Sequence, residues 1–462
     1  MKKTEQKVLK FVDENSLITK GDKIIVSFSG GSDSVFLLYF LKKFQNRFNI
    51  SLAAFHLNHM LRGKDADLDE SFCENMCGEF NIPFYSVRKN VKQFSMKCKI
   101  SVEEAGREIR YAELRKLIKR TGFNKIATGH HINDNAETVL LNLFKGTGLK
   151  GISGIPAVRE NIIRPILIAS KEEIINYLKL ENLKFRIDSS NEILDYERNF
   201  IRHKLLPLIK QNLNPSVESA LFISSRSFRK IYSYLLKKTS NDLKELTPDK
   251  NGLRIPLDKL KNFDDELLTF ALKEVVAGNF SVNLTFNNIN SLKNLIAKET
   301  GMKLKVSNDL IVYKERTDLV FFRNVDFPAQ INVSEELVIG GEKTFGDLTI
   351  SVKPVEIEKI SPGKNKTQEF ISADNLFENK FTIRSWQEGD RFFPFGMKGS
   401  KKISDFLNEI KTESHSKKDQ LLLLYGNKIV WVIGHRIDDR FKIKKDTKKV
   451  LELCIKIKPR RK

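Results

Sequence analysis

The feature of this sequence that most constrains its fold is a regular alternation of short apolar runs with longer helical patterns in the first third of the chain. The apolar runs lie at 24–28, 51–57, 84–87 and 125–128. The helical patterns that follow them lie at 34–44, 65–80, 102–121 and 133–144. Such an alternation predicts an α/β fold, in which a doubly wound parallel sheet is covered by helices on both faces.

The domain organisation follows from where this alternation stops. It fades after about residue 180, and 462 residues are too many for a single core. Asn214-Pro215 is typical of a domain edge, and 361–367 has the composition of a linker. We therefore predict a catalytic domain at 1–215, a mixed helical and β middle domain at 216–370, and a small α/β C-terminal domain at 371–462.

Charge and cysteine content narrow the class of protein. The net charge of +22 indicates a polyanionic partner, with nucleic acid first, although lysine-rich sequences also spread charge for solubility. Four cysteines without a C-x-x-C pair indicate reduced thiols rather than a metal or disulfide framework. The first residues lack the apolar core of a signal peptide, and the apolar segments are too short to span a bilayer. We expect a cytoplasmic protein that does not enter a membrane.

A Gly/Ser-rich loop between the first predicted strand and the first predicted helix carries the strongest chemical pattern. Ligands of open α/β sheets bind at such strand ends. Glycines let the backbone approach an anion, and N–H groups, hydroxyls and the helix dipole can hold phosphate. A carboxylate in a phosphate cradle, here Asp33, implies a bridging divalent cation, so Mg²⁺ is expected. The predicted cofactor-binding residues are Ser29, Gly30, Gly31, Ser32, Asp33 and Ser34.

This loop is not a Walker A loop, because no Gly-Lys-Ser/Thr follows. It is not a dinucleotide fingerprint either, because it lacks the Gly-x-Gly-x-x-Gly spacing. The alternative interpretation is a Gly/Ser turn that only caps the helix.

A second group joins an imidazole to two carboxylates. If the helix predicted at 133–144 begins near His130, then His130, Asp134 and Glu137 share one helical face. Such a face could hold an ammonium group, coordinate a metal or position a proton acceptor. The alternative is a helix start whose acids complement the dipole.

Basic residues suggest further contacts with phosphate. Arg107 and Arg110 lie on the helix predicted at 102–121, where they either face an anion or form a solvated face. Basic and aromatic residues also alternate near the C-terminus, a mixture that suits phosphate contacts and base stacking, or else places the aromatics in a core. These residues are Arg384, Arg391, Lys398, Lys401, Lys402, Arg436 and Arg440, with Trp386, Phe392, Phe393, Phe395 and Trp431.

Gly340-Gly341, in the β-rich stretch that precedes this C-terminal module, predicts a hairpin turn.

These motifs together resemble a known enzyme family. The loop at 29–34 is similar to the Ser-Gly-Gly-x-Asp-Ser loop of ATP-pyrophosphatases, and the run at 128–138 resembles that of tRNA(Ile)-lysidine synthetases. Further matches are the Gly-rich stretch 145–156, Arg164-Pro165, Asp188–Asn191 with Arg198 and Arg202, and the C-terminal stretches 389–397, 401–406 and 431–441. The chain departs from the Glu-Ala-Ala-Arg pattern of the family, here residues 104–107, because Gly106 stands where Ala is usual.

The resemblance implies a reaction in which ATP adenylates the C2 oxygen of a wobble cytidine and the ε-amine of L-lysine then displaces AMP. The implied partners are tRNA(Ile) with a CAU anticodon and L-lysine, and the implied cofactors are ATP and Mg²⁺. The two later domains are expected to bind tRNA. The implied metal ligands are Asp33 and Asp134, and the implied catalytic residues are Asp33, His130, Asp134, Glu137 and Arg110.

Three alternatives stay open at this point. A tRNA thiolase of the same superfamily relies on cysteine chemistry that is commonly marked by C-x-x-C, which this chain lacks. A small-molecule amidotransferase or synthetase would not need the net charge of +22, and a catalytically inactive RNA-binding protein would not need intact Asp33 and Asp134. The sequence does not decide between a monomer and a homodimer.

Overall fold

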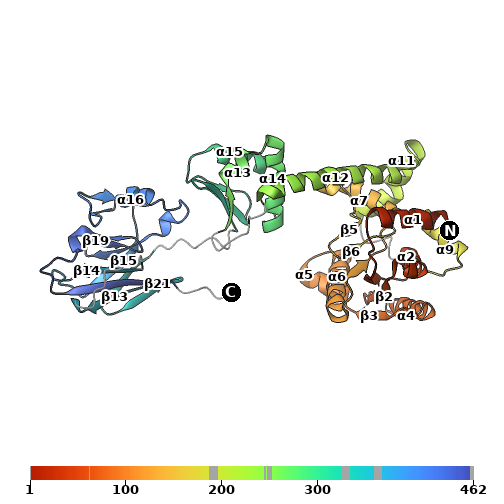
Figure 1. Ribbon diagram of the computed structural model, residues 1–462, viewed down its shortest axis with the longest axis horizontal. Helices are drawn as coiled ribbons and strands as arrows, with labels where there is room; N and C mark the ends of the chain where they lie inside the picture. The colour runs from red at the N-terminus through yellow and green to blue at the C-terminus, as the bar shows by residue number, and fades with distance from the viewer. Residues whose placement is uncertain are drawn as a thin grey trace. The chain divides into compact units, whose positions relative to one another are not determined.

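The computed structural model of the protein describes residues 2–61, 63–186, 196–243, 246, 252–323, 333–357 and 367–457 (Figure 1). The chain forms two compact units, Met1–Leu236 and Lys237–Lys462. The motif at Asp188–Asn191 and most of the predicted linker lie outside the described residues. The domain limits predicted at 215 and 370 stay predictions.

The first unit contains a six-stranded sheet in the order β3-β2-β1-β4-β6-β5. All neighbouring strands run parallel except β5, which pairs antiparallel with β6. The strands are β1 (Lys23–Ser27), β2 (Ser51–Asn58), β3 (Phe84–Arg88), β4 (Lys125–Ala127), β5 (Val158–Arg159) and β6 (Ile162–Ile163). The predicted parallel sheet is therefore confirmed.

Helices cover both faces of this sheet because successive strand residues point to opposite sides. Ile24 and Val26 belong to a buried core shared with α1 (Lys3–Glu14), α2 (Ser32–Lys43), α4 (Lys64–Glu79) and α9 (Lys171–Leu180). Ile25 belongs instead to the core on the other face, with α5 (Val91–Cys98) and α6 (Val102–Thr121). The ribbons of these helices are drawn in red to yellow in Figure 1.

The sheet order creates a natural binding position. β1 lies between β2 and β4 in the sheet. After β1 the chain continues to β2 on one side, and after β4 it continues to the strands β5 and β6 on the other side. Crevices at such switch points, beyond the carboxyl ends of the strands, bind ligands in open α/β sheets. The loop after β1 leads into α2, and the loop after β4 leads into α7 (Ile132–Phe144).

The other named elements of the first unit are helices. A π-helical turn, Ile201–Leu205, continues into α11 (Leu206–Asn212). The remaining elements are α3 (Gln45–Phe48), α8 (Gly148–Ile152), α10 (Tyr196–Phe200) and α12 (Val217–Leu243), which continues into the second unit.

The second unit contains two groups of elements with separate cores. In the first group, an antiparallel sheet in the order β7-β10-β9-β8 packs with helices α13 to α15. Its elements are β7 (Leu253–Pro256), α13 (Leu257–Lys261), α14 (Asp265–Phe280), α15 (Phe286–Ala297), β8 (Lys303–Lys305), β9 (Leu310–Lys314) and β10 (Asp318–Arg323).

The second group is rich in strands. Its two main sheets have the orders β11-β15-β18-β19-β20 and β12-β13-β21-β14, and their side chains share one core. Its elements are β11 (Ser334–Val338), β12 (Glu342–Phe345), β13 (Leu348–Val355), β14 (Gln368–Ser372), β15 (Lys380–Ser385), β16 (Arg391–Phe392), β17 (Lys401–Lys402), α16 (Ile403–Glu409), β18 (Leu421–Tyr425), β19 (Lys428–Val432), β20 (Arg436–Ile437) and β21 (Val450–Ile457).

The predicted hairpin at Gly340-Gly341 is wrong in one respect. A turn is present, since the Gly341 N–H donates to the Val338 carbonyl at 2.9 Å. However, β11 and β12 on its two sides belong to different sheets, so the turn connects sheets and closes no hairpin.

None of the helices in the described part of the chain is both long and apolar enough for a membrane span.

Candidate active site

The loop after β1 forms a turn at the start of α2. Gly31 is the N-cap of the helix, and the Ser34 hydroxyl donates to the Gly31 carbonyl at 2.9 Å. Gly30 has a φ of +81°, and a Cβ there would lie 3.1 Å from the Cys73 sulfur. Only glycine suits that position without strain. The turn therefore leaves backbone N–H groups at the helix N-terminus for an anion.

A lysine from α9 reaches into this loop. The Nζ atom of Lys171 donates to both carboxylate oxygens of Asp33, at 2.8 and 2.7 Å, and to the Ser32 hydroxyl at 2.7 Å. The backbone N–H of Lys171 donates to the Asn133 side chain on α7, at 3.0 Å. Lys171 thus links the loop after β1 to the helix after β4.

The helix after β4 begins one residue before the predicted start at Asn133, and it does not extend back to His130. α7 begins at Ile132, and His131 is its N-cap in an extended conformation. The His131 N–H donates to the Asp134 carboxylate at 2.9 Å, which fixes the helix start at this residue. His130 lies before the helix, so the prediction that it shares a helical face with Asp134 and Glu137 is wrong.

His131 takes the place that the sequence assigned to His130. Its Nε2 atom lies 3.8 Å from the Asp33 carboxylate and 3.5 Å from the Asp134 carboxylate. Its buried Nδ1 atom has no hydrogen-bond partner among the described residues, which leaves one polar atom for a ligand. An imidazole therefore lies between the carboxylate of the loop and that of α7.

The two carboxylates of α7 have different surroundings. Glu137 is 1% exposed and accepts hydrogen bonds from Arg198 and Arg202, the shortest at 2.6 Å. Asp134 is partly exposed and lies 3.5 Å from the Arg202 guanidinium. Burial favours the protonated form of Asp134, but His131, His130, Arg198 and a backbone hydrogen bond outweigh it and lower the pKa. Asp134 is therefore a carboxylate at neutral pH.

These groups line one cavity of about 380 Å³. It brings together the predicted residues Asp33, Asp134 and Glu137, and the positive charges at its wall come from α9, α11 and the turn before α11. The lining residues are Asp33, His131, Asn133, Asp134, Glu137, Lys171, Arg202, Leu206, Pro207, Lys210 and Glu218.

His130 itself contacts another residue. Its Nδ1 atom lies 2.9 Å from the Thr128 hydroxyl. Burial lowers the pKa of His130 to about 4, with further lowering by Arg164, Arg107 and Arg198 against an opposing effect of Asp134. The imidazole is therefore neutral at physiological pH. His130 does not line the cavity.

Arg110 lies on α6, outside the lining of the cavity. Its guanidinium lies 3.4 Å from Nε2 of His59, and burial lowers its pKa. His59 explains the departure at Gly106, because a Cβ at Gly106 would lie 2.7 Å from the His59 ring. Arg107, one turn earlier, is exposed and stacks over Tyr111 at 5.5 Å.

Eight lining residues of the cavity are not among the predicted site residues: His131, Asn133, Lys171, Arg202, Leu206, Pro207, Lys210 and Glu218. No motif of neighbouring residues connects Lys171 to the loop, because Lys171 and Asp33 are 138 residues apart in the sequence. Ser170, the N-cap of α9, and Glu173 form a pattern that predicts only the start of a helix, and the structure has that helix start.

The donor set at the loop suits Mg²⁺ bound with phosphate. Mg²⁺ prefers oxygen ligands and is usually held by one or two carboxylates together with substrate phosphates. Asp33 provides a carboxylate at a helix N-terminus that can bind those phosphates. No group of three or more His, Cys, Asp or Glu side chains among the described residues could hold a metal without such a substrate.

The cysteines do not form a comparable centre. Cys73 and Cys77 are buried, and burial raises the pKa of both thiols, that of Cys77 to about 12. A buried, protonated thiol is a poor nucleophile.

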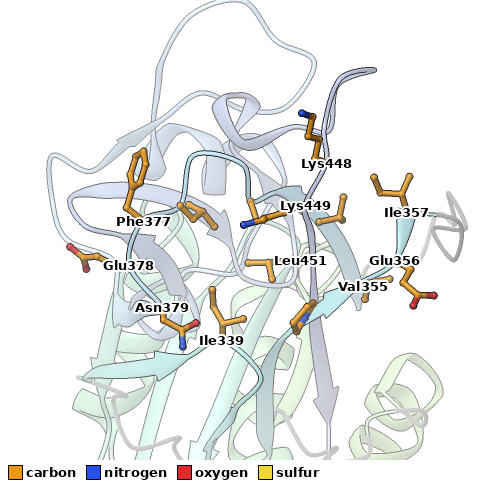
Figure 2. A pocket seen from close by; sticks show the side chains of 14 residues that line it. Ile339, Val355, Glu356, Ile357, Phe377, Glu378, Asn379, Lys448, Lys449 and Leu451 are labelled. Carbon is orange, nitrogen blue, oxygen red and sulfur yellow. The ribbon is translucent and has the colours of Figure 1, made fainter.

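A larger cavity of about 980 Å³ lies in the strand-rich part of the second unit (Figure 2). Phe377, which is 92% exposed, stands at its margin with Lys448 and Lys449. None of the predicted site residues lines it.

Comparison with known proteins adds independent findings. The family model of the PP-loop domain matches residues 1–209, and that of the TilS substrate C-terminal domain matches residues 381–453. A tRNA(Ile)-lysidine synthase of Caldanaerobacter subterraneus subsp. tengcongensis is 33% identical, with 96% of each chain covered. A protein of the same name from Bacteroides thetaiotaomicron is 33% identical and covers 97% of this chain and 98% of its own.

Solved structures are less similar. The U34-tRNA thiolase NcsA from Methanococcus maripaludis is 20% identical, with 49% of this chain and 78% of its own covered at a TM-score of 0.42. A solved TilS C-terminal domain is 15% identical, with 27% and 98% covered at a TM-score of 0.25. Neither score carries an argument about function.

Proposed function

The chain belongs to the tRNA(Ile)-lysidine synthase family, and on that premise we propose that it uses ATP to join L-lysine to C2 of the wobble cytidine of tRNA(Ile). The observation that supports this most is the single cavity lined by Asp33 from the loop after β1 and by Asp134 and Glu137 from α7. A nucleotide and an amino acid can react with one base only if their sites adjoin in this way.

The ATP half of the proposed site is the loop from Ser29 to Ser34. Its backbone N–H groups and the N-terminus of α2 bind the phosphates. Asp33 would hold Mg²⁺, which when bound offsets phosphate charge during the adenylation. The C2 oxygen of the cytidine attacks the α-phosphorus, and pyrophosphate leaves.

The amine half of the proposed site is the face of α7. Asp134 is a partly exposed carboxylate in the cavity and can pair with an ammonium group of lysine. Glu137 is already bonded by Arg198 and Arg202, so its role is to position those two arginines beside Asp134. The lysine ε-amine must be deprotonated to attack C2 and displace AMP. The sequence also assigned Asp134 as a second metal ligand; that assignment stays a prediction, and slower adenylation in Asp134→Asn would support it over a role limited to the amine.

Four further predictions complete the proposal. The second unit binds the tRNA, with exposed Arg391, Lys398, Lys402 and Arg436 as phosphate contacts. Arg110 acts outside the cavity, where it neutralises RNA phosphate. The protein works in the cytoplasm, and a homodimer stays a prediction that sedimentation of the full chain would test.

The test is a coupling assay with the full chain, labelled L-lysine, ATP, Mg²⁺ and a tRNA(Ile) transcript with a CAU anticodon. We expect lysine in the RNA with equal amounts of AMP and pyrophosphate, and no product when any component is omitted. A transcript with uridine at the wobble position is the matched control and should remain unmodified. Release of ADP in place of AMP, or lysine incorporation without ATP, contradicts the proposal.

A further inference from the structure

The ammonium group of Lys171 is placed where the phosphates of ATP are proposed to bind. It makes three hydrogen bonds of 2.7 to 2.8 Å, two to Asp33 and one to Ser32. An ammonium group has three donors, so the loop uses all of them. The side chain of Lys171 is nevertheless 40% exposed, and it lines the cavity.

The backbone around Lys171 is fixed from two sides. The Lys171 N–H donates to Asn133 on α7, and the Ile132 N–H donates to the Ala169 carbonyl at 3.0 Å. A capping box between Ser170 and Glu173 defines the start of α9. The lysine stem therefore leaves a rigid point, and only its flexible side chain is free to change partners.

Nucleotide binding brings competing partners to both groups. An Mg²⁺ ion held by Asp33 would compete with the Lys171 ammonium for the same carboxylate oxygens, and the two positive charges would repel each other. Phosphate oxygens carry more negative charge than the single carboxylate and lie within reach of the same loop.

We propose that Lys171 is the phosphate-binding residue that leaves Asp33 for the β- and γ-phosphates of ATP and holds pyrophosphate as it departs. The inference rests on the proposed function and assigns this side chain to the leaving group. As the C2 oxygen bonds to the α-phosphorus, the bond between that phosphorus and the bridging oxygen breaks. Its electron pair stays with pyrophosphate, and the fixed positive charge of Lys171 stabilises the added negative charge.

Equilibrium binding of ATP, pyrophosphate and AMP, each with Mg²⁺, to the full-length protein tests this assignment. Lys171→Gln should weaken binding of ATP and pyrophosphate by about 10- to 100-fold, the loss expected for one charge-assisted bond, and should leave AMP binding unchanged. Lys171→Arg should restore part of the affinity for pyrophosphate. Lys179→Gln removes the same charge from an exposed position on the same helix and should bind all three ligands as the parent does.

A second measurement needs no variant. Acylation of lysine amines, read for each peptide by mass spectrometry, should slow at Lys171 when pyrophosphate and Mg²⁺ are added, and should not slow at Lys179 or with AMP. The inference is overturned if pyrophosphate leaves acylation of Lys171 unchanged, or if Lys171→Gln weakens AMP binding as much as pyrophosphate binding. The second result would mean that Lys171 only holds the loop in shape. A parent protein that does not bind ATP at all would overturn the proposed function as well.

Discussion

One buried carboxylate in each unit is paired in a different way. In the first unit, Glu137 is 1% exposed and is bonded by Arg198 and Arg202, residues 61 and 65 positions away in the sequence. In the second unit, Asp438 is fully buried and is bonded chiefly by Arg440, two residues away. Long-range pairs build a cavity wall from several elements, whereas the local pair stabilises one loop.

Two basic residues of each unit show the same contrast. Lys171 and Arg202 in the first unit line the cavity. Arg384 in the second unit forms two bonds of 2.7 Å with Asp390, and Arg440 lies 4.7 Å from the Phe393 ring. Charged residues of the C-terminal motifs are therefore partly structural, and a basic residue in a motif is not by itself an RNA contact.

The largest effect is expected at the loop of the first unit. Asp33→Asn keeps the shape but removes the charge that would hold Mg²⁺, so pyrophosphate release should slow by about 10²- to 10³-fold. A quenched assay with labelled ATP and tRNA measures this rate, and thermal unfolding shows whether the protein is folded. Asp65→Asn, an exposed change on α4, is the control. A loss below about twofold in Asp33→Asn would place the chemistry elsewhere.

In the second unit, Asp438→Asn should lower stability by about 2 kcal/mol, because it weakens bonds to a fully buried group. The rate per folded molecule should not change. Tryptophan fluorescence during urea unfolding reports this unit selectively, since the only two tryptophans, Trp386 and Trp431, lie there. Asp446→Asn, at an exposed position, should unfold like the parent. Unchanged unfolding in Asp438→Asn would contradict the claim that Asp438 stabilises the second unit.

The smallest effect concerns pH. The folded protein lowers the pKa of His130 from 6.5 to about 4, so between these values the unfolded chain binds more protons and stability falls as pH falls. From about pH 7 to about pH 5, hydrogen-exchange protection in β4 and α7 should decrease by about 1–2 kcal/mol. His130→Gln should reduce that pH dependence, and the lowered pKa of buried His56 should account for part of what remains. An equal slope in the variant and the parent would contradict this assignment.

Local patterns made the sheet and the phosphate loop predictable from the sequence. Strand–loop–helix periodicity fixes the position of the loop at Ser29–Ser34, because the strand and helix signals lie next to it. The start of α7 was predicted less well, since the doubled His130-His131 does not indicate which residue caps the helix. Lys171 was not predictable, because only the packing of α9 beside α2 brings it to Asp33.

Strand pairing was also beyond the sequence. Gly340-Gly341 predicts a turn correctly, but the partners of β11 and β12 are β15 and β13, which depend on long-range contacts.

The most direct test of the account is the fate of labelled AMP in Asp134→Asn. The variant is mixed with ATP labelled at the α-phosphate and with tRNA(Ile), first without and then with L-lysine. The account predicts that the tRNA acquires AMP at the parent rate, and that added lysine releases AMP at least about tenfold more slowly than in the parent. The account is contradicted if the variant fails to label tRNA, which is the result expected for Asp33→Asn. It is also contradicted if lysine releases AMP at the parent rate. Either result would mean that the two adjoining sites do not have separate tasks.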